Sequence, residues 1–216
     1  MRKIALLAPL SAPLLASAAG PNLLSNGGFE NLAGAALEGW GGYTYGAGYS
    51  QPMAGWTVDT GSVDIVHKDT AWGPASEGNF SLDINGWDAG KITSNSFATV
   101  VGQIYTVSFD YSRNVYGSAD FVATANAGGQ SLVITTQNDT GTYGTPYHMK
   151  WVSTGFQFKA QEELTTLSFT ANTQGNAGVF LDNVSVTAAV PEPETYALML
   201  AGLAAVGFVA RRRKSA

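Results

Sequence analysis

The chain has 216 residues, 26 of them glycine, no cysteine, and a formal net charge of −5. Without cysteine the protein cannot form disulfides, thiolate nucleophiles or sulfur-ligated metal sites. Residues 20–188, which exclude the two terminal segments, contain five basic and fourteen acidic residues, a net charge of about −9. This balance disfavours nucleic acid as a partner, because such binding depends on Lys and Arg neutralising phosphates.

The N-terminal segment, residues 1–19, has the layout of a secretory signal peptide. Arg2 and Lys3 precede an apolar stretch over residues 4–15, and small residues at 16–18 then offer a signal-peptidase site. Pro9 and Pro13 within the stretch argue against a buried helix, because each removes a helical hydrogen bond. We therefore expect signal peptidase to remove about the first 19 residues.

The body, residues 20–188, predicts an all-β domain. Apolar and polar residues alternate over short runs, and Gly, Asn, Asp and Pro separate the runs, as in a sandwich or barrel. Residues 39–55 are rich in Gly and Tyr and predict a long loop. The predicted strands are 23–25, 63–68, 80–84, 91–97, 105–111, 121–125, 132–136, 151–158, 164–171 and 179–187.

The C-terminal segment, residues 189–216, has three parts. A Pro-Glu-Pro motif comes first, an uncharged apolar run over residues 195–210 follows, and a basic cluster ends it. As a helix the run would reach about 24 Å, short for a hydrocarbon core of about 30 Å but able to cross it where the bilayer thins. The basic cluster should stay cytoplasmic and stop transfer. The motif is Pro191, Glu192 and Pro193; the cluster is Arg211, Arg212, Arg213 and Lys214.

This tripartite end resembles the PEP-CTERM sorting signal. The resemblance implies export, attachment to the inner membrane through residues 195–210, and cleavage near the Pro-Glu-Pro motif by an exosortase. It also implies a place in the cell envelope or outside the cell, in the polysaccharide matrix of biofilm- or floc-forming Gram-negative bacteria.

Fragments of the body, in their order along the chain, resemble the choice-of-anchor C family. They are also similar to DUF642-type proteins and to carbohydrate-binding-module jelly rolls of the galactose-binding-like fold. The resemblance implies a jelly-roll β-sandwich in an extracellular setting and specifies no ligand. The fragments are Asn22–Glu30, Gly55–Val58, Gly61–Asp64, Ser81–Asp83, Gly102–Phe109 and Phe180–Val186.

Asp182 is the strongest candidate metal ligand. It shares the parity of Phe180, Val184 and Val186 in the last predicted strand, and a carboxylate on an apolar face needs a cation or hydrogen-bond donors. If the chain ends lie side by side, Glu30 approaches it, and two carboxylates with backbone carbonyls suit a structural calcium ion. The alternative is that Asp182 caps a turn and Glu30 is solvated.

Aromatic residues in loop-rich regions form the candidate ligand site. Sugar rings stack on aromatic faces, and pockets combine aromatic walls with a few polar groups. The alternative is that these rings only cover the ends of the sandwich or, like Trp56, belong to the core. The candidate ligand-binding residues are Trp72, Trp87, Tyr43 and Tyr45.

Catalysis finds little support in the sequence. His67 and His148 lack metal-pair spacing, and the chain has no Gly-x-Ser-x-Gly elbow. We therefore expect a non-catalytic protein of the extracellular matrix that binds exopolysaccharide. The alternatives are a structural or adhesive module that binds other envelope proteins, and a small carbohydrate-active enzyme.

Overall fold

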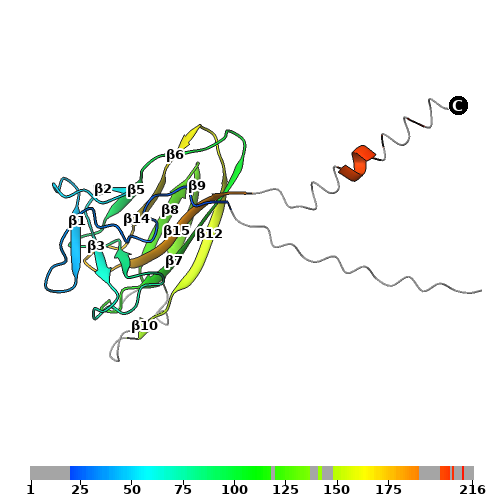
Figure 1. The fold of residues 1–216 in the computed structure, drawn as a ribbon. Coiled ribbons are helices and arrows are strands. Elements are labelled where there is room, and N and C mark those ends of the chain that lie inside the picture. The colour runs from blue at the N-terminus through cyan, green and yellow to red at the C-terminus, as the bar shows by residue number, and fades with distance from the viewer. Residues whose placement is uncertain are drawn as a thin grey trace, which may run out of the picture. The chain divides into compact units, whose positions relative to one another are not determined.

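The protein, described here as a computed structural model, is a sandwich of two antiparallel β-sheets (Figure 1). The structure describes residues 20–117, 120–136, 141–142, 148–189, 200–204, 206 and 211. The all-β jelly-roll class expected from the sequence is confirmed. Residues 21–189 form one compact unit.

The larger sheet has six strands. Their spatial order is β1 (Gly42–Gly46), β3 (Ser62–His67), β4 (Phe80–Asp83), β15 (Val179–Ala188), β7 (Ile104–Arg113) and β12 (Val152–Lys159). The smaller sheet has five strands, in the order β2 (Trp56–Thr60), β5 (Lys91–Ser94), β14 (Leu167–Ala171), β8 (Val122–Ala127) and β9 (Gln130–Thr135). Two short pairs complete the body: β6 (Phe97–Ala98) with β13 (Leu164–Thr165), and β10 (Gly141–Thr142) with β11 (His148–Met149).

The main core lies between the two sheets. Buried and partly exposed residues alternate along β8 and β14, as expected of strands with one face toward a core. Aromatic rings link the layers: Phe169 of β14 meets Phe109 of β7 edge to face at 5.1 Å and lies 6.1 Å from Trp56 of β2. Trp56 is therefore a core residue, 3% exposed.

The outer face of the six-stranded sheet is also covered. Val66, Val115, Met149 and Phe180 form a second buried cluster, against which Trp40, Trp72 and Trp151 pack. As a result β4 and the first half of β15 are buried on both faces, and β15 begins with a continuous apolar run, Val179–Leu181. The candidate site lies on this outer face, where Trp40 and Trp72 pack.

A β-bulge changes the parity of β15. The register shifts between Asp182 and Ser185, and Asn183 adopts a left-handed backbone conformation with φ of 50°. Val184 consequently packs in the main core, whereas Phe180 packs in the outer cluster. The prediction that Asp182 lies on the same face of the strand as Val184 and Val186 is therefore wrong. Asp182 lies on the outer face with Phe180, whereas Val184 faces the main core.

Other details also differ from the predicted strands, and β2 (Trp56–Thr60) was not among them. Residues 23–25 form no strand, because Leu23 makes a single ladder-like bond, from its N–H to Val186 O at 2.9 Å. The predicted loop at 39–55 contains β1, whose central residues include the buried Tyr45. The predicted strands 91–97 and 164–171 are each divided in two.

The terminal segments are described only in part. Residues 200–204 are helical, and Arg211 is the one residue of the basic cluster that the structure describes. The predicted signal peptide and the Pro191–Glu192–Pro193 motif lie outside the described residues, as does most of the apolar run. Within the described part of the chain, every helix is too short or too polar to cross a membrane.

Candidate functional site

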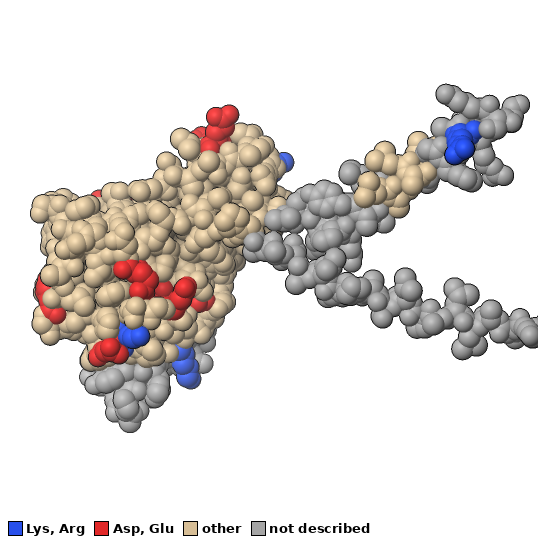
Figure 2. Space-filling view, in the orientation of Figure 1, with Lys and Arg blue, Asp and Glu red and all other residues tan. Residues whose placement is uncertain are grey.

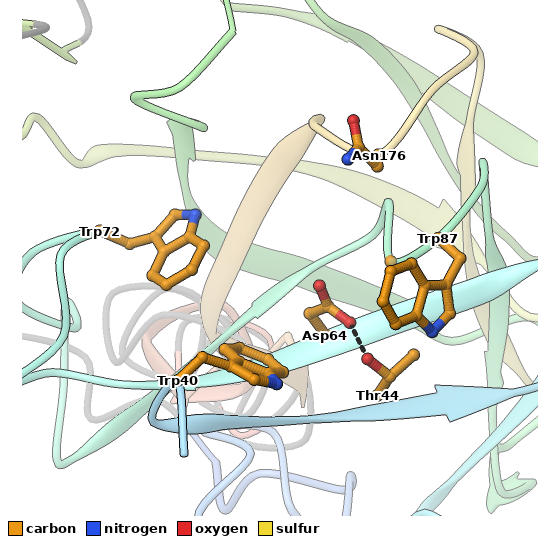
Figure 3. Close-up of a pocket in the computed structure, with 7 residues that line it drawn as sticks. Trp40, Thr44, Asp64, Trp72, Trp87 and Asn176 are labelled. Atoms are coloured by element: carbon orange, nitrogen blue, oxygen red, sulfur yellow. Dashed lines mark hydrogen bonds between the residues drawn. The ribbon is translucent and has the colours of Figure 1, made fainter. Parts of the chain in front are cut away.

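A pocket of about 220 Å³ opens at the β1–β3–β4 side of the six-stranded sheet, on its outer face (Figure 3). Each strand supplies part of it. β1 provides Thr44, with Trp40 just before the strand; β3 provides Asp64, with Trp72 in the segment that follows. The turn after β4 and the loop before β15 complete the wall. The lining residues are Trp40, Thr44, Asp64, Trp72, Gly86, Trp87 and Asn176.

Asp64 is the charged group of the pocket. It lies directly opposite Thr44 on β1 and Asp83 on β4, so the three side chains form a row on the outer face. The Thr44 hydroxyl donates to Asp64 Oδ1 at 2.6 Å. Burial raises the pKa of Asp64 to about 6, the Thr44 hydrogen bond opposes this shift, and the nearby charge of Glu38 adds to it.

Asp83 lies behind Asp64 and is closed off from the pocket. It is 2% exposed, and its carboxylate accepts hydrogen bonds from Asn85 N at 2.9 Å and Asn114 Nδ2 at 2.6 Å. Burial raises its pKa well above the usual range despite these donors. Asn85 in turn donates to the carbonyls of Thr173 and Gly175, both at 2.9 Å, which holds the loop that carries Asn176.

The turn after β4 is built on Ser62. The N–H of Gly86 donates to Ser62 O at 2.9 Å, and the N–H of Trp87 donates to Ser62 Oγ at 2.8 Å. A Cβ at position 86 would lie 2.8 Å from Ser62 Oγ and 3.0 Å from Asp64 Oδ1. Glycine is therefore required for the turn to approach the carboxylate this closely.

Three tryptophans form the walls. Trp40 and Trp72 meet edge to face with centroids 5.7 Å apart, and Tyr116 supports Trp72 in the same way at 5.2 Å. Trp40 Nε1 donates to Glu38 Oε2 at 2.8 Å, which fixes its indole. Trp87 is 71% exposed, an unusual position for so large an apolar side chain.

The structure brings two of the four predicted ligand residues together. Trp72 and Trp87 both line the pocket, whereas Tyr43 and Tyr45 do not. Tyr45 is 1% exposed and donates its hydroxyl to Leu32 O at 2.7 Å, and burial raises its pKa to about 12. Tyr43 packs against Tyr45 and the core at a centroid distance of 4.8 Å. Tyr45 therefore belongs to the core, because alternation along β1 turns it inward.

Glu30 and Asp182 both accept backbone hydrogen bonds from residues 77–80. Glu30 Oε1 accepts hydrogen bonds from Asn79 N at 2.7 Å and Phe80 N at 2.9 Å. Asp182 accepts hydrogen bonds from Glu77 N at 2.9 Å and Asn183 N at 2.7 Å. Burial raises the pKa of Asp182 to about 7, against these amide donors.

Calcium takes six to eight oxygens, of which these two carboxylates, already bonded to amide N–H groups, would supply part. No group of three or more His, Cys, Asp or Glu that could hold a metal occurs among the described residues. Calcium at Glu30 and Asp182 stays a prediction, which melting with and without a chelator tests.

The fold and the pocket together define a jelly-roll β-sandwich with a pocket lined by aromatic residues and one carboxylate. Residues 22–187 match DUF642, described as a protein family of unknown function, and residues 189–214 match the PEP-CTERM protein-sorting motif. The chain belongs to the DUF642 family. Its sorting motif supports an exported, envelope-associated protein.

Relatives and solved structures of this kind include proteins from diverse sources. The chain is 30% identical over 172 residues to Halomucin of Haloquadratum walsbyi, a match that covers 79% of this chain but spans only 2% of that protein's length. A cyclase from Fischerella sp. TAU is 16% identical, with a TM-score of 0.52 over 81% of this chain and 98% of the cyclase, and this likeness shows the fold alone. TmCBM61, solved with β-1,4-galactotriose, is 14% identical with a TM-score of 0.47 over 79% of this chain and all of that one.

Proposed function

We propose that this protein is a non-catalytic, exported envelope protein that binds carbohydrate in the tryptophan pocket. The pocket itself carries the proposal. Indoles give the apolar faces on which sugar rings stack, while Asp64, Thr44 and Asn176 place polar groups among them. At about 220 Å³ the pocket is smaller than the roughly 300–1,000 Å³ typical of drug-sized ligands, which suits one sugar residue rather than a long chain segment.

The chain ends support a place outside the cytoplasm. We propose that signal peptidase removes residues 1–19, that residues 195–210 hold the protein at the inner membrane, and that an exosortase cuts near Pro191–Glu192–Pro193. The body would then act in the extracellular polysaccharide matrix, with exopolysaccharide as its partner.

An enzymatic role has a weaker basis in the pocket. Glycoside hydrolysis in most families uses two carboxylates flanking the bond, about 5–10 Å apart. Asp64 and Asp83 are neighbours across strands, but Asp83 is buried with both oxygens bonded, so it cannot reach a ligand in the pocket. Hydrolysis of a polysaccharide by the purified protein would contradict the non-catalytic proposal.

Binding to native exopolysaccharide and to a glycan array tests the proposal. We expect Trp87→Ala and Trp72→Ala to weaken binding by about ten-fold or more, since loss of an aromatic stacking partner costs more than its buried area alone. Tyr49→Ala is the matched control, because Tyr49 is 53% exposed and does not line the pocket. Unchanged binding in both tryptophan variants would remove the pocket as the site. Retention by envelope proteins but not by glycans would favour the adhesive alternative.

A further inference from the structure

The pocket is electrostatically one-sided. Of its seven lining residues Asp64 is acidic and none is Lys, Arg or His. The charges of Glu38 and Asp64 raise the pKa values of Asp64 and Asp83 respectively, so the negative groups here lie close enough to repel each other. On the face in Figure 2, Asp and Glu side chains occur at several separate places, and Lys and Arg side chains are fewer. The pocket therefore favours a cation over an anion.

Asp64 has one oxygen free for a ligand. Oδ1 accepts the Thr44 hydroxyl, and Oδ2 accepts no hydrogen bond from any residue that the structure describes. This oxygen is open to solvent in the pocket, because it is not among the buried unbonded atoms of the described residues. A ligand that donates a charged N–H to Oδ2 would form a charge-assisted hydrogen bond and balance the charge of the carboxylate.

The walls around this carboxylate suit an organic cation rather than a metal ion. The faces of indoles attract ammonium groups, and Trp gives the strongest attraction of the aromatic residues. In Figure 3 the Asp64 carboxylate stands between the indoles of Trp40 and Trp87. A divalent metal would need several oxygen ligands, but the pocket offers one carboxylate among three indoles.

We infer that the pocket selects a cationic amino sugar, one with a free ammonium group, from among the carbohydrates. This inference rests on the proposed function and names its ligand class. The apolar face of the sugar ring stacks on an indole while its ammonium donates to Asp64 Oδ2. An N-acetylated sugar has the same ring but no charge, so it keeps the stacking and loses the ion pair.

The test compares β-1,4-linked glucosamine oligosaccharide with its N-acetylated counterpart by calorimetry on the full protein at about pH 6.5, which is above the pKa of about 6 of Asp64. We expect the glucosamine form to bind about ten-fold or more tightly, the scale of a charge-assisted hydrogen bond. Asp64→Asn should abolish this preference, so that the two forms bind that variant with affinities within about two-fold of each other. Asp69→Asn is the control, because it makes the same charge change at a side chain that is 77% exposed and outside the pocket.

The outcomes separate the inference from the function on which it rests. Equal binding of both oligosaccharides, unchanged in Asp64→Asn, would overturn the amino-sugar inference and leave carbohydrate binding intact. Binding of oligolysine as tight as that of glucosamine oligosaccharide, with the same loss in Asp64→Asn, would overturn the sugar assignment in favour of a basic protein. Absence of binding to every glycan on the array would overturn the proposed function itself. If Asp64→Asn melts far below the wild type, Trp87→Phe is the second variant, and it tests the contact between the ammonium group and the indole. An unchanged preference for the glucosamine form in Trp87→Phe would also overturn the inference.

Discussion

Two regions on the outer face of the six-stranded sheet contain carboxylates, and they are built differently. On β3, Asp64 opens into the tryptophan pocket with one oxygen unbonded. On β15 and β7, Asp182 and Asp110 lie opposite each other beneath residues 74–79, which are bonded to both. Both regions place acids on the same face of one sheet, yet only the first leaves an acid open to a ligand.

The second region shows how a buried carboxylate is made structural. Burial alone would raise the pKa of Asp110, but hydrogen bonds from Ser153, Ser76 and Asn183 outweigh it and lower the pKa. Asp182 accepts backbone N–H groups instead and keeps a raised pKa. Burial alone therefore does not distinguish the two kinds of carboxylate. An acid whose two oxygens are both hydrogen-bonded to the protein holds a loop in place, whereas an acid with an unbonded oxygen can bind a ligand.

The largest expected effect tests whether the outer face is a second core. Phe180 and Leu181 are adjacent on β15, both 0% exposed, and point to opposite faces of the sheet. Phe180→Ala should reduce the free energy of unfolding by about 3–5 kcal/mol, and Leu181→Ala by about 2–5 kcal/mol. Chemical denaturation measures both, with the 62% exposed Val133→Ala as control. A loss below about 1 kcal/mol for Phe180→Ala would mean that the outer cluster is only a loose cover.

The next effect concerns the loop held by Asp182. Asp182→Ala leaves the N–H groups of Glu77 and Asn183 without their acceptor, so we expect a loss of about 1–3 kcal/mol in unfolding free energy. Asp182→Asn keeps an acceptor oxygen and should lose less. Hydrogen exchange at Glu77 should rise in the alanine variant. Wild-type stability and exchange in that variant would show that the loop is held by other contacts.

The pH dependence of stability follows from the raised pKa of Asp182. An aspartate whose pKa is about 7 in the folded state and 3.8 in the unfolded state binds its proton more tightly when folded. Its contribution to stability is therefore complete below about pH 4 and is lost as the pH rises to about 7. Denaturation at a series of pH values, with chelator present, should show this decline. Burial also raises the pKa values of Asp64 and Asp83, which add to the decline, so Asp182→Asn should make it shallower. A slope that is the same in Asp182→Asn as in the wild type would contradict the raised pKa of Asp182.

The sequence predicts the fold more completely than the site. Alternation and turn residues are local signals, so most strands and the all-β class can be inferred from them. The bulge at Asn183 has no such signal, and it reverses the face of Val184 relative to Asp182. β1 is hidden in a Gly-rich run, although Tyr43 and Tyr45 within it carry the core-facing pattern.

The pocket was predictable only in part for the same reason. Trp72 and Trp87 are conspicuous because they stand beside Gly, Pro and Asp. Asp64, Thr44 and Asn176 are ordinary polar residues until the pairing of β1, β3 and β4 brings them together. The available signal was the alternation in β3, which sets Asp64 opposite in parity to Val63 and Ile65. Cross-strand pairing is non-local, and one sequence does not encode it in any short pattern.

The smallest expected effect on stability is that of Asp64→Asn. The change removes a charge that burial already disfavours and keeps an oxygen to accept the Thr44 hydroxyl, so the free energy of unfolding at neutral pH should stay within about 0.5 kcal/mol of the wild type or rise. Asp182→Ala, on the same face of the same sheet, should be clearly destabilised in parallel melts. The difference lies in the hydrogen bonds, because Asp64→Asn keeps an acceptor for Thr44 whereas Asp182→Ala leaves two backbone N–H groups without theirs. If Asp64→Asn were as destabilised as Asp182→Ala, both carboxylates would be structural, and the distinction between the two regions would fail.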